Sequence, residues 1–116
     1  MKENEKEKEK EKENETKFSI DLIILPEMAL TGYVYDNKEE IIKFCEVYND
    51  ESETITFKLG KYLSLKYDCY TLIGYPEKKE DQLYNSAALF DRSGCLLKNF
   101  RKHFLYETDK VRLKTF

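Results

Sequence analysis

A run of four apolar residues, Leu22-Ile-Ile-Leu25, sets the strongest limit on what this chain can fold into. The run is too short for a surface helix and too uniform for a half-exposed strand. It therefore predicts a strand buried on both faces, as in the parallel core of an α/β sheet. Pro26 lacks a backbone N–H and is expected to end the strand. Glu27 then lies at the strand's carboxyl end, where open α/β sheets bind their ligands.

The amino-terminal segment differs in composition from the rest of the chain. Residues 2–15 contain only Lys, Glu and Asn, so this segment has no apolar side chain to bury. We predict a disordered, solvated tail over residues 1–17, followed by a single partial domain over residues 18–116. An inert charge run is a better interpretation of the tail than a tether for a charged partner.

Composition argues against several functional classes. The chain has 20 basic and 23 acidic residues and no basic stripe, so nucleic-acid binding is not predicted. No apolar segment is long enough to span a membrane, and the amino terminus lacks the apolar core of a signal peptide. Cys45, Cys69 and Cys95 lack the spacing of metal ligands, so neither a metal nor another cofactor is predicted. Reduced thiols in a cytoplasmic protein are the simplest interpretation.

Two helices are expected after the first strand. Asn37 and Glu40 have the spacing of a helix N-cap and its reciprocal partner. The amphipathic helix that they open is expected to have one apolar face, formed by Ile41, Cys45 and Tyr48. A second helix is predicted over residues 52–67, where Gly60 would permit close packing against a neighbouring element. The apolar residues at helical spacing, expected to form the inner face of this second helix, are Ile55, Leu59, Tyr62 and Leu63.

Three further strands complete a mixed α/β layer. Residues 69–75 are rich in β-forming side chains and should end at Pro76, which would leave Glu77 as a second carboxylate at a strand end. Residues 84–90 and 95–100 flank a glycine-containing turn and are expected to form a hairpin. A layer of this size leaves one face of its sheet with little to cover it.

Four segments, in this order, resemble the carbon–nitrogen hydrolase (nitrilase) superfamily. They are Leu25-Pro-Glu27 with Thr31-Gly-Tyr33, Gly74-Tyr-Pro-Glu77, Tyr84-Asn-Ser86 and Phe100-Arg-Lys102. Residues 27–33 and 101–109 are most similar to the fungal-type protein N-terminal amidases, which deamidate amino-terminal Asn or Gln and so feed the N-degron pathway. The resemblance implies a partial α-β-β-α sandwich that acts on protein or peptide N-termini without a cofactor.

The same resemblance implies roles for individual residues. Glu27 matches the general base, and Lys102 matches the cation that stabilises the oxyanion of the tetrahedral intermediates. Arg101 is expected to be a salt-bridging neighbour. Three candidate substrate-binding residues, which packing or strand-end hydrogen bonds explain equally well, are Tyr33, Glu77 and Asn85. A fourth is Asp109, paired with Glu107, because a carboxylate would suit the free α-ammonium that an N-terminal amidase must bind.

The family's nucleophile is a cysteine at a strand-to-helix elbow well after the lysine, and none of the three cysteines matches it. The chain is therefore expected to be a form truncated at both ends and inactive by itself. Two alternatives stay open. One is a different carbon–nitrogen hydrolase, such as an ω-amidase or a ureide hydrolase. The other is a non-enzymatic fragment that binds a full-length relative through its exposed sheet.

Overall fold

The computed structural model describes residues 4–6, 19–32, 37–48 and 53–105. Residues 4–6 are helical, and the rest of the predicted tail lies outside the described residues. The elements in chain order are β1 (Leu22–Leu25), α2 (Lys38–Ile41), the 3-10 turn η1 (Ile42–Phe44), α3 (Ile55–Tyr67), β2 (Tyr70–Lys79), β3 (Gln82–Phe90) and β4 (Leu96–Arg101).

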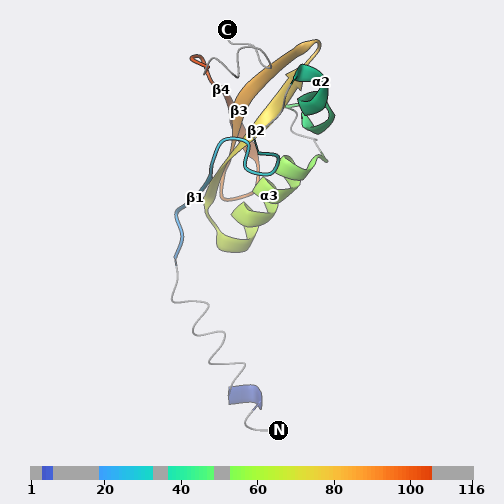
Figure 1. Ribbon diagram of the computed structural model, residues 1–116. Helices are drawn as coiled ribbons and strands as arrows, with labels where there is room; N and C mark the ends of the chain where they lie inside the picture. Colours follow the sequence, from blue (N-terminus) through green and yellow to red (C-terminus); the bar gives the residue numbers. More distant parts are fainter. Residues whose placement is uncertain (1–3, 7–18, 33–36, 49–52, 106–116) are drawn as a thin grey trace.

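The four strands form one mixed sheet in the order β1-β2-β3-β4. β1 runs parallel to β2, whereas β2, β3 and β4 are joined as antiparallel neighbours. Figure 1 shows α3 lying along the sheet and α2 near the far end of the β2–β3 hairpin. The ammonium of Lys38 in α2 donates to the carbonyl of Asp81 in that hairpin turn, at 2.7 Å. The predicted mixed α/β layer is therefore confirmed.

β1 is less buried than the sequence predicts. Leu22 and Ile24 are both exposed, with 62% of Ile24 accessible to solvent, and the alternate residues Ile23 and Leu25 are only half-buried. The expectation of burial on both faces is wrong for the described residues. Among these residues α3 covers one face of the sheet. The apolar side chains that point to the other face therefore stay exposed.

The core between α3 and the sheet is aromatic. The ring of Phe57 meets the rings of Tyr75 and Phe90 edge to face, with centroids 5.4 and 5.9 Å apart. Gly60 lies one turn further along α3, and a Cβ there would fall 2.2 Å from the ring of Phe90. This contact confirms that Gly60 permits close packing.

The inner face of α3 differs from the predicted one. Ile55 and Tyr62 are exposed. Two polar pairs help to fix the helix instead: the Glu46 carboxylate accepts hydrogen bonds from the backbone N–H and hydroxyl of Thr56, and the Ser64 hydroxyl donates to Thr71 Oγ1 at 2.8 Å. Apolar periodicity does not register polar pairs of this kind. The buried residues of α3 are Thr56, Phe57, Gly60 and Ser64.

Pro76 does not end β2, contrary to the sequence-based expectation, because the strand continues to Lys79. The carbonyl of Pro76 accepts from Glu46 N at 2.9 Å, and Lys78 N donates back to Glu46 O at 2.8 Å. The nitrogen and carbonyl of one strand residue face the same edge, so the missing N–H of Pro76 faces away from β3 and removes no bond to it. Glu77 therefore lies inside the strand rather than at its end.

Candidate active site

The segment that carries Glu27 crosses directly over β2 at Gly74. A Cβ at Gly74 would lie 2.4 Å from the carbonyl oxygen of Pro26 and 2.6 Å from Glu27 Cα, distances that only glycine allows. Ala29 N also donates to Gly74 O at 3.1 Å. Because strand residues alternate between faces and Tyr75 points toward α3, Gly74 and Glu27 lie on the opposite face.

Met28 anchors the turn that follows Glu27. Its side chain is buried in a cluster with Ile41, Leu83 and Leu105. Its backbone is left-handed, with φ of +49°, a conformation that costs a non-glycine residue about 1 kcal/mol. The carbonyl of Met28 also accepts from Gly32 N at 2.8 Å. Burial and this hydrogen bond offset the strain and fix the backbone beside Glu27.

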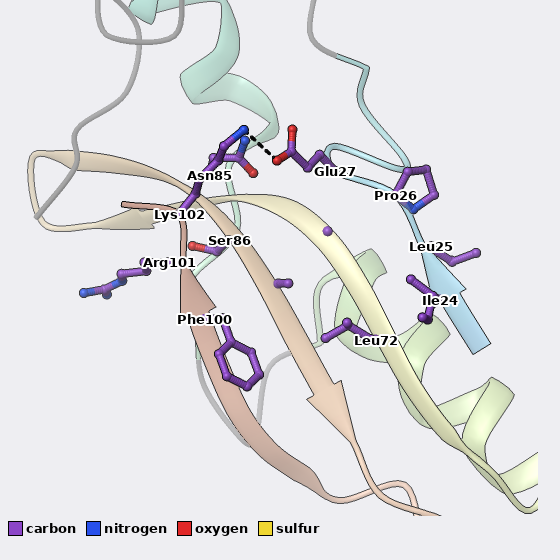
Figure 2. Close-up of a pocket in the computed structure, with 12 residues that line it drawn as sticks. Ile24, Leu25, Pro26, Glu27, Leu72, Asn85, Ser86, Phe100, Arg101 and Lys102 are labelled. Atoms are coloured by element: carbon purple, nitrogen blue, oxygen red, sulfur yellow. Dashed lines mark hydrogen bonds and ion pairs between the residues drawn. The ribbon is translucent and has the colours of Figure 1, made fainter. Parts of the chain in front are cut away.

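Lys102 follows the last residue of β4 and approaches Glu27 from the other side of the cavity. Its backbone N donates to Asn85 O at 2.8 Å, which extends the β3–β4 pairing by one step. Its Nζ lies 2.8 Å from Glu27 Oε1 (Figure 2). The side chains are 28% and 39% exposed, and ion pairs with this much solvent contribute at most about 1 kcal/mol to stability.

The Glu27–Lys102 pair closes one end of a cavity of about 320 Å³. Glu27, Asn85 and Lys102 form its polar end, while Ile24, Leu72 and Phe100 line the apolar side (Figure 2). A volume in this range suits a small ligand or one side chain of a larger one. A carboxylate can take up and return a proton here, and the adjacent ammonium can offset negative charge that develops on a bound oxygen.

The structure separates Glu77 from this cavity. Glu77 is 1% exposed and does not line the cavity. Its Oε1 accepts from Arg101 Nε at 2.8 Å, Ser86 Oγ at 2.8 Å and Asn99 Nδ2 at 2.7 Å, and its Oε2 accepts from Arg101 Nη2 at 2.6 Å. The salt-bridging role expected for Arg101 is thus confirmed. Figure 2 shows Arg101 directed away from Glu27, as alternation along the chain requires.

Charge and hydrogen bonding control the ionisation of this buried group. Burial alone would raise the pKa of Glu77, but the hydrogen bonds from Arg101, Ser86 and Asn99 outweigh it and hold the pKa below its usual value. The same contact raises the pKa of Arg101. Sequence reasoning missed this network because Asn99 belongs to no motif and Ser86 enters only as the end of the Tyr84-Asn-Ser86 segment, with no role of its own. Their only signal is the β-strand alternation that puts them on the same face as Arg101.

The remaining candidates fall in two groups. Asn85 lines the cavity next to Lys102. Tyr33 and Asp109, with Glu107, lie outside the described residues, so their predicted roles stay predictions.

None of the three cysteines lines the cavity. Cys45 packs against the Met28 cluster, where burial raises the pKa of its thiol to about 11. Cys69 is buried, and Cys95 is exposed in the β3–β4 turn. No group of His, Cys, Asp or Glu among the described residues has the arrangement of a metal site. The helices in the same part of the chain are all too short or too polar to cross a membrane.

Comparison with known proteins finds a family that this chain matches. Residues 10–116 match the family described as Carbon-nitrogen hydrolase. The Protein N-terminal amidase of Saccharomyces cerevisiae is 42% identical over 90 residues, which cover 77% of this chain and 19% of that protein. The Protein N-terminal amidase of Schizosaccharomyces pombe is 43% identical over 97 residues, which cover 79% of this chain and 33% of that protein.

This chain is also similar to a solved structure of an N-terminal amidase. A crystal structure of N-terminal amidase with an Asn-Glu peptide has a TM-score of 0.77 and 38% sequence identity, and the match covers 85% of this chain and 23% of that one. The chain therefore spans between 19% and 33% of the length of these three relatives. The four-stranded sheet with its helices matches part of the nitrilase fold. On these matches, the chain belongs to the carbon–nitrogen hydrolase family.

Proposed function

We propose that this chain supplies the general base and the oxyanion-stabilising cation of an amidohydrolase that deamidates N-terminal Asn or Gln of proteins. The observation that carries the proposal is the 2.8 Å contact between Lys102 Nζ and Glu27 Oε1 at the polar end of the cavity. The choice of substrate is supported by the two relatives named Protein N-terminal amidase and by the amidase structure with an Asn-Glu peptide.

The proposed reaction divides between two half-steps. Glu27 takes the proton of the thiol as the sulfur attacks the carboxamide carbon. The C–N bond then breaks, and the proton leaves with ammonia. In the second half-step Glu27 takes a proton from water as the water oxygen attacks the thioester carbon. The C–S bond then breaks, the departing sulfur takes the proton back from Glu27, and the acid is released. Lys102 offsets the negative charge on the acyl oxygen in both tetrahedral intermediates.

The proposal needs a thiol from elsewhere. Cys45, Cys69 and Cys95 all lie away from the cavity. The nucleophile in this scheme therefore belongs to polypeptide other than these 116 residues. We expect the 116-residue chain alone to release no ammonia from an Asn-leading peptide. Release that Glu27→Gln abolishes would contradict this expectation.

A segment exchange tests whether Glu27 and Lys102 have the proposed catalytic roles. The matched segment of the S. pombe amidase is replaced by the segment of this chain that aligns with it, and ammonia release is followed with Asn-leading and Gln-leading peptides. Glu27→Gln and Lys102→Gln should each lower kcat by about 100-fold or more. A free ω-amide and a ureide, assayed beside the peptides, test the alternative that the site serves a different carbon–nitrogen hydrolase.

The chain contains a matched control for both substitutions. Glu53 and Lys58 form an exposed ion pair at 3.6 Å, so Glu53→Gln and Lys58→Gln make the same chemical changes away from the cavity. These controls should leave kcat unchanged. A folded exchange enzyme whose activity survives Glu27→Gln would overturn the proposal.

A cytoplasmic location and a place in the N-degron pathway belong to the same proposal. All three cysteines are free in the structure, which is the usual state in a reducing compartment. Fractionation of cells that produce the epitope-tagged protein tests the location. Recovery of the tag in the secreted fraction would contradict it.

Exposed apolar side chains favour a second candidate function, non-catalytic association with a full-length relative. By sheet register Leu22, Ile24, Tyr70 and Phe100 share the face opposite α3, and all four are exposed. Contiguous exposed apolar surface of this kind is typical of a binding surface. Co-purification with a relative, lost in the double variant Ile24→Lys with Phe100→Lys, would support this candidate over an enzymatic one.

A further inference from the structure

Asn85 carries an unsatisfied polar group at the cavity. The residue is 2% exposed, and its side-chain Nδ2 has no hydrogen-bond partner. Among the described residues no other buried side-chain nitrogen or oxygen is left in this state. Folded proteins satisfy the great majority of such groups, so an orphaned donor that lines a cavity indicates a bound acceptor.

The neighbours of Asn85 do not supply that acceptor in the structure. Across the sheet Asn85 pairs with Pro76, whose side chain has no polar atom. On its other side the adjacent residue is Lys102, whose side chain carries donors only. The nearby carboxylate of Glu27 accepts from Lys102 Nζ at 2.8 Å but makes no hydrogen bond to Asn85 Nδ2. A molecule bound in the cavity can supply the missing acceptor.

The position of Asn85 indicates which atom of that molecule it binds. Figure 2 shows the side chains of Asn85 and Lys102 next to each other, both facing Glu27. An oxygen placed there would meet an amide N–H and an ammonium together, with a carboxylate beside it. Two converging donors suit an acyl oxygen, and they suit it better as negative charge develops on that oxygen.

We propose that Asn85 Nδ2 donates a hydrogen bond to the acyl oxygen of the bound carboxamide, as the second donor beside Lys102. This inference rests on the proposed function, because it takes the ligand to be the substrate's carboxamide. Lys102 supplies the charge on a flexible stem, whereas Asn85 supplies a neutral donor fixed by its strand. The two together fix both the position of the oxygen and the plane of the amide.

The first test uses the full 116-residue chain and NMR. The side-chain amide resonances of Asn85 and the backbone amide of Lys102 are followed while acetamide, and then an Asn-Glu peptide, is added. The resonances of Asn85 and Lys102 should both shift, over the same range of ligand concentration. Asn85→Leu, an apolar side chain of similar size, should weaken the binding seen at Lys102 by about three- to tenfold. Gln82→Leu removes a side-chain amide from the same strand outside the cavity and should change nothing.

The stability of Asn85→Leu separates ligand binding from a structural role. Leucine removes the orphaned donor, so the variant should unfold at the same urea concentration as the wild type or a higher one. A structural role predicts the reverse. A ligand-induced shift at Lys102 without one at Asn85, no shift at either, or unchanged binding in Asn85→Leu would each overturn the proposal.

The segment-exchange enzyme gives a kinetic readout of the same residue. Asn85→Leu should lower its kcat by about 100-fold with little change in KM, because the hydrogen bond strengthens as the oxyanion forms. A rise of about 100-fold in KM with unchanged kcat would contradict a role at the acyl oxygen. An exchange enzyme that releases no ammonia would count against the proposed function, while the NMR titration would still decide the role of Asn85.

Discussion

Replacing Arg101 alone should destabilise the fold more than replacing Arg101 and Glu77 together. The Glu77 carboxylate is 1% exposed and receives two of its four hydrogen bonds from Arg101. Arg101→Met leaves the carboxylate buried with only the donors Ser86 and Asn99. Breaking a buried ion pair in this way costs about 3–5 kcal/mol, and we expect a value of about 3 kcal/mol because two donors stay in place.

The double variant tests whether the buried charge of Glu77 causes the loss of stability. When Glu77→Gln accompanies Arg101→Met, the glutamine oxygen can still accept from Ser86 and Asn99, but no charge is left buried. The double variant should therefore recover about half of the stability that Arg101→Met loses. Urea unfolding followed by circular dichroism measures each free energy by linear extrapolation.

An exposed ion pair provides the comparison. Lys58→Met breaks the surface contact between Lys58 and Glu53 and should cost less than about 1 kcal/mol. The reasoning is refuted if Arg101→Met costs no more than Lys58→Met, or if adding Glu77→Gln restores nothing.

The network also predicts how stability depends on pH. The pKa of Glu77 is lower in the folded chain than its ordinary value of 4.5, so the folded state binds this proton less readily than the unfolded state. The stabilisation by Glu77 is therefore complete above pH 4.5 and is lost as the pH falls through the folded pKa. The free energy of unfolding, measured from neutral to acid pH, should fall less steeply for Glu77→Gln than for the wild type. Parallel profiles would contradict the assignment.

Three further predictions concern local contacts. Gly74→Ala should cost about 1–3 kcal/mol, because its Cβ would meet the backbone of Pro26 and Glu27; urea unfolding measures this, and an unchanged midpoint would contradict the close approach. Glu46→Ala should cost about 1–2 kcal/mol, because its carboxylate accepts from the first turn of α3 at Thr56; the same assay applies, and Glu39→Ala on the exposed first turn of α2 is the control. Cys45 should react with iodoacetamide far more slowly than the exposed Cys95, because burial raises the pKa of Cys45 to about 11; equal rates by mass spectrometry would contradict this.

Element positions were predictable where local patterns determine them. The first helix is an exception: its expected apolar face extends to Tyr48, but α2 ends at Ile41 and a 3-10 turn follows. The N-cap at Asn37 accepts from Glu40 N, as its spacing indicates, and the apolar run at residues 22–25 is a strand. The errors concern tertiary context. Whether an apolar strand is covered on both faces depends on elements distant in sequence, and whether a proline ends a strand depends on which edge its nitrogen faces. Neither property is visible in a window of a few residues.

For the candidate site too, motifs predicted individual residues, whereas the contacts between them depend on tertiary context. Glu27 and Lys102 were singled out by motif, but their contact depends on Gly74, which lets one segment cross another. Glu77 was predicted as a strand-end carboxylate because Pro76 was taken as a terminator. Once the strand continues through Pro76, alternation turns Glu77 toward α3 and into contact with Arg101.

Two adjacent cations therefore do different work on opposite faces of one sheet. The side chain of Arg101 is 17% exposed, and its planar guanidinium binds both oxygens of Glu77, a geometry that lysine cannot reproduce. This contact fixes the end of β4 against β2. Lys102, the next residue, is consequently held on the other face, where its compact ammonium reaches Glu27 across the cavity. The buried pair thus positions the exposed one, so a substitution at Glu77 should change the cavity even though Glu77 does not line it.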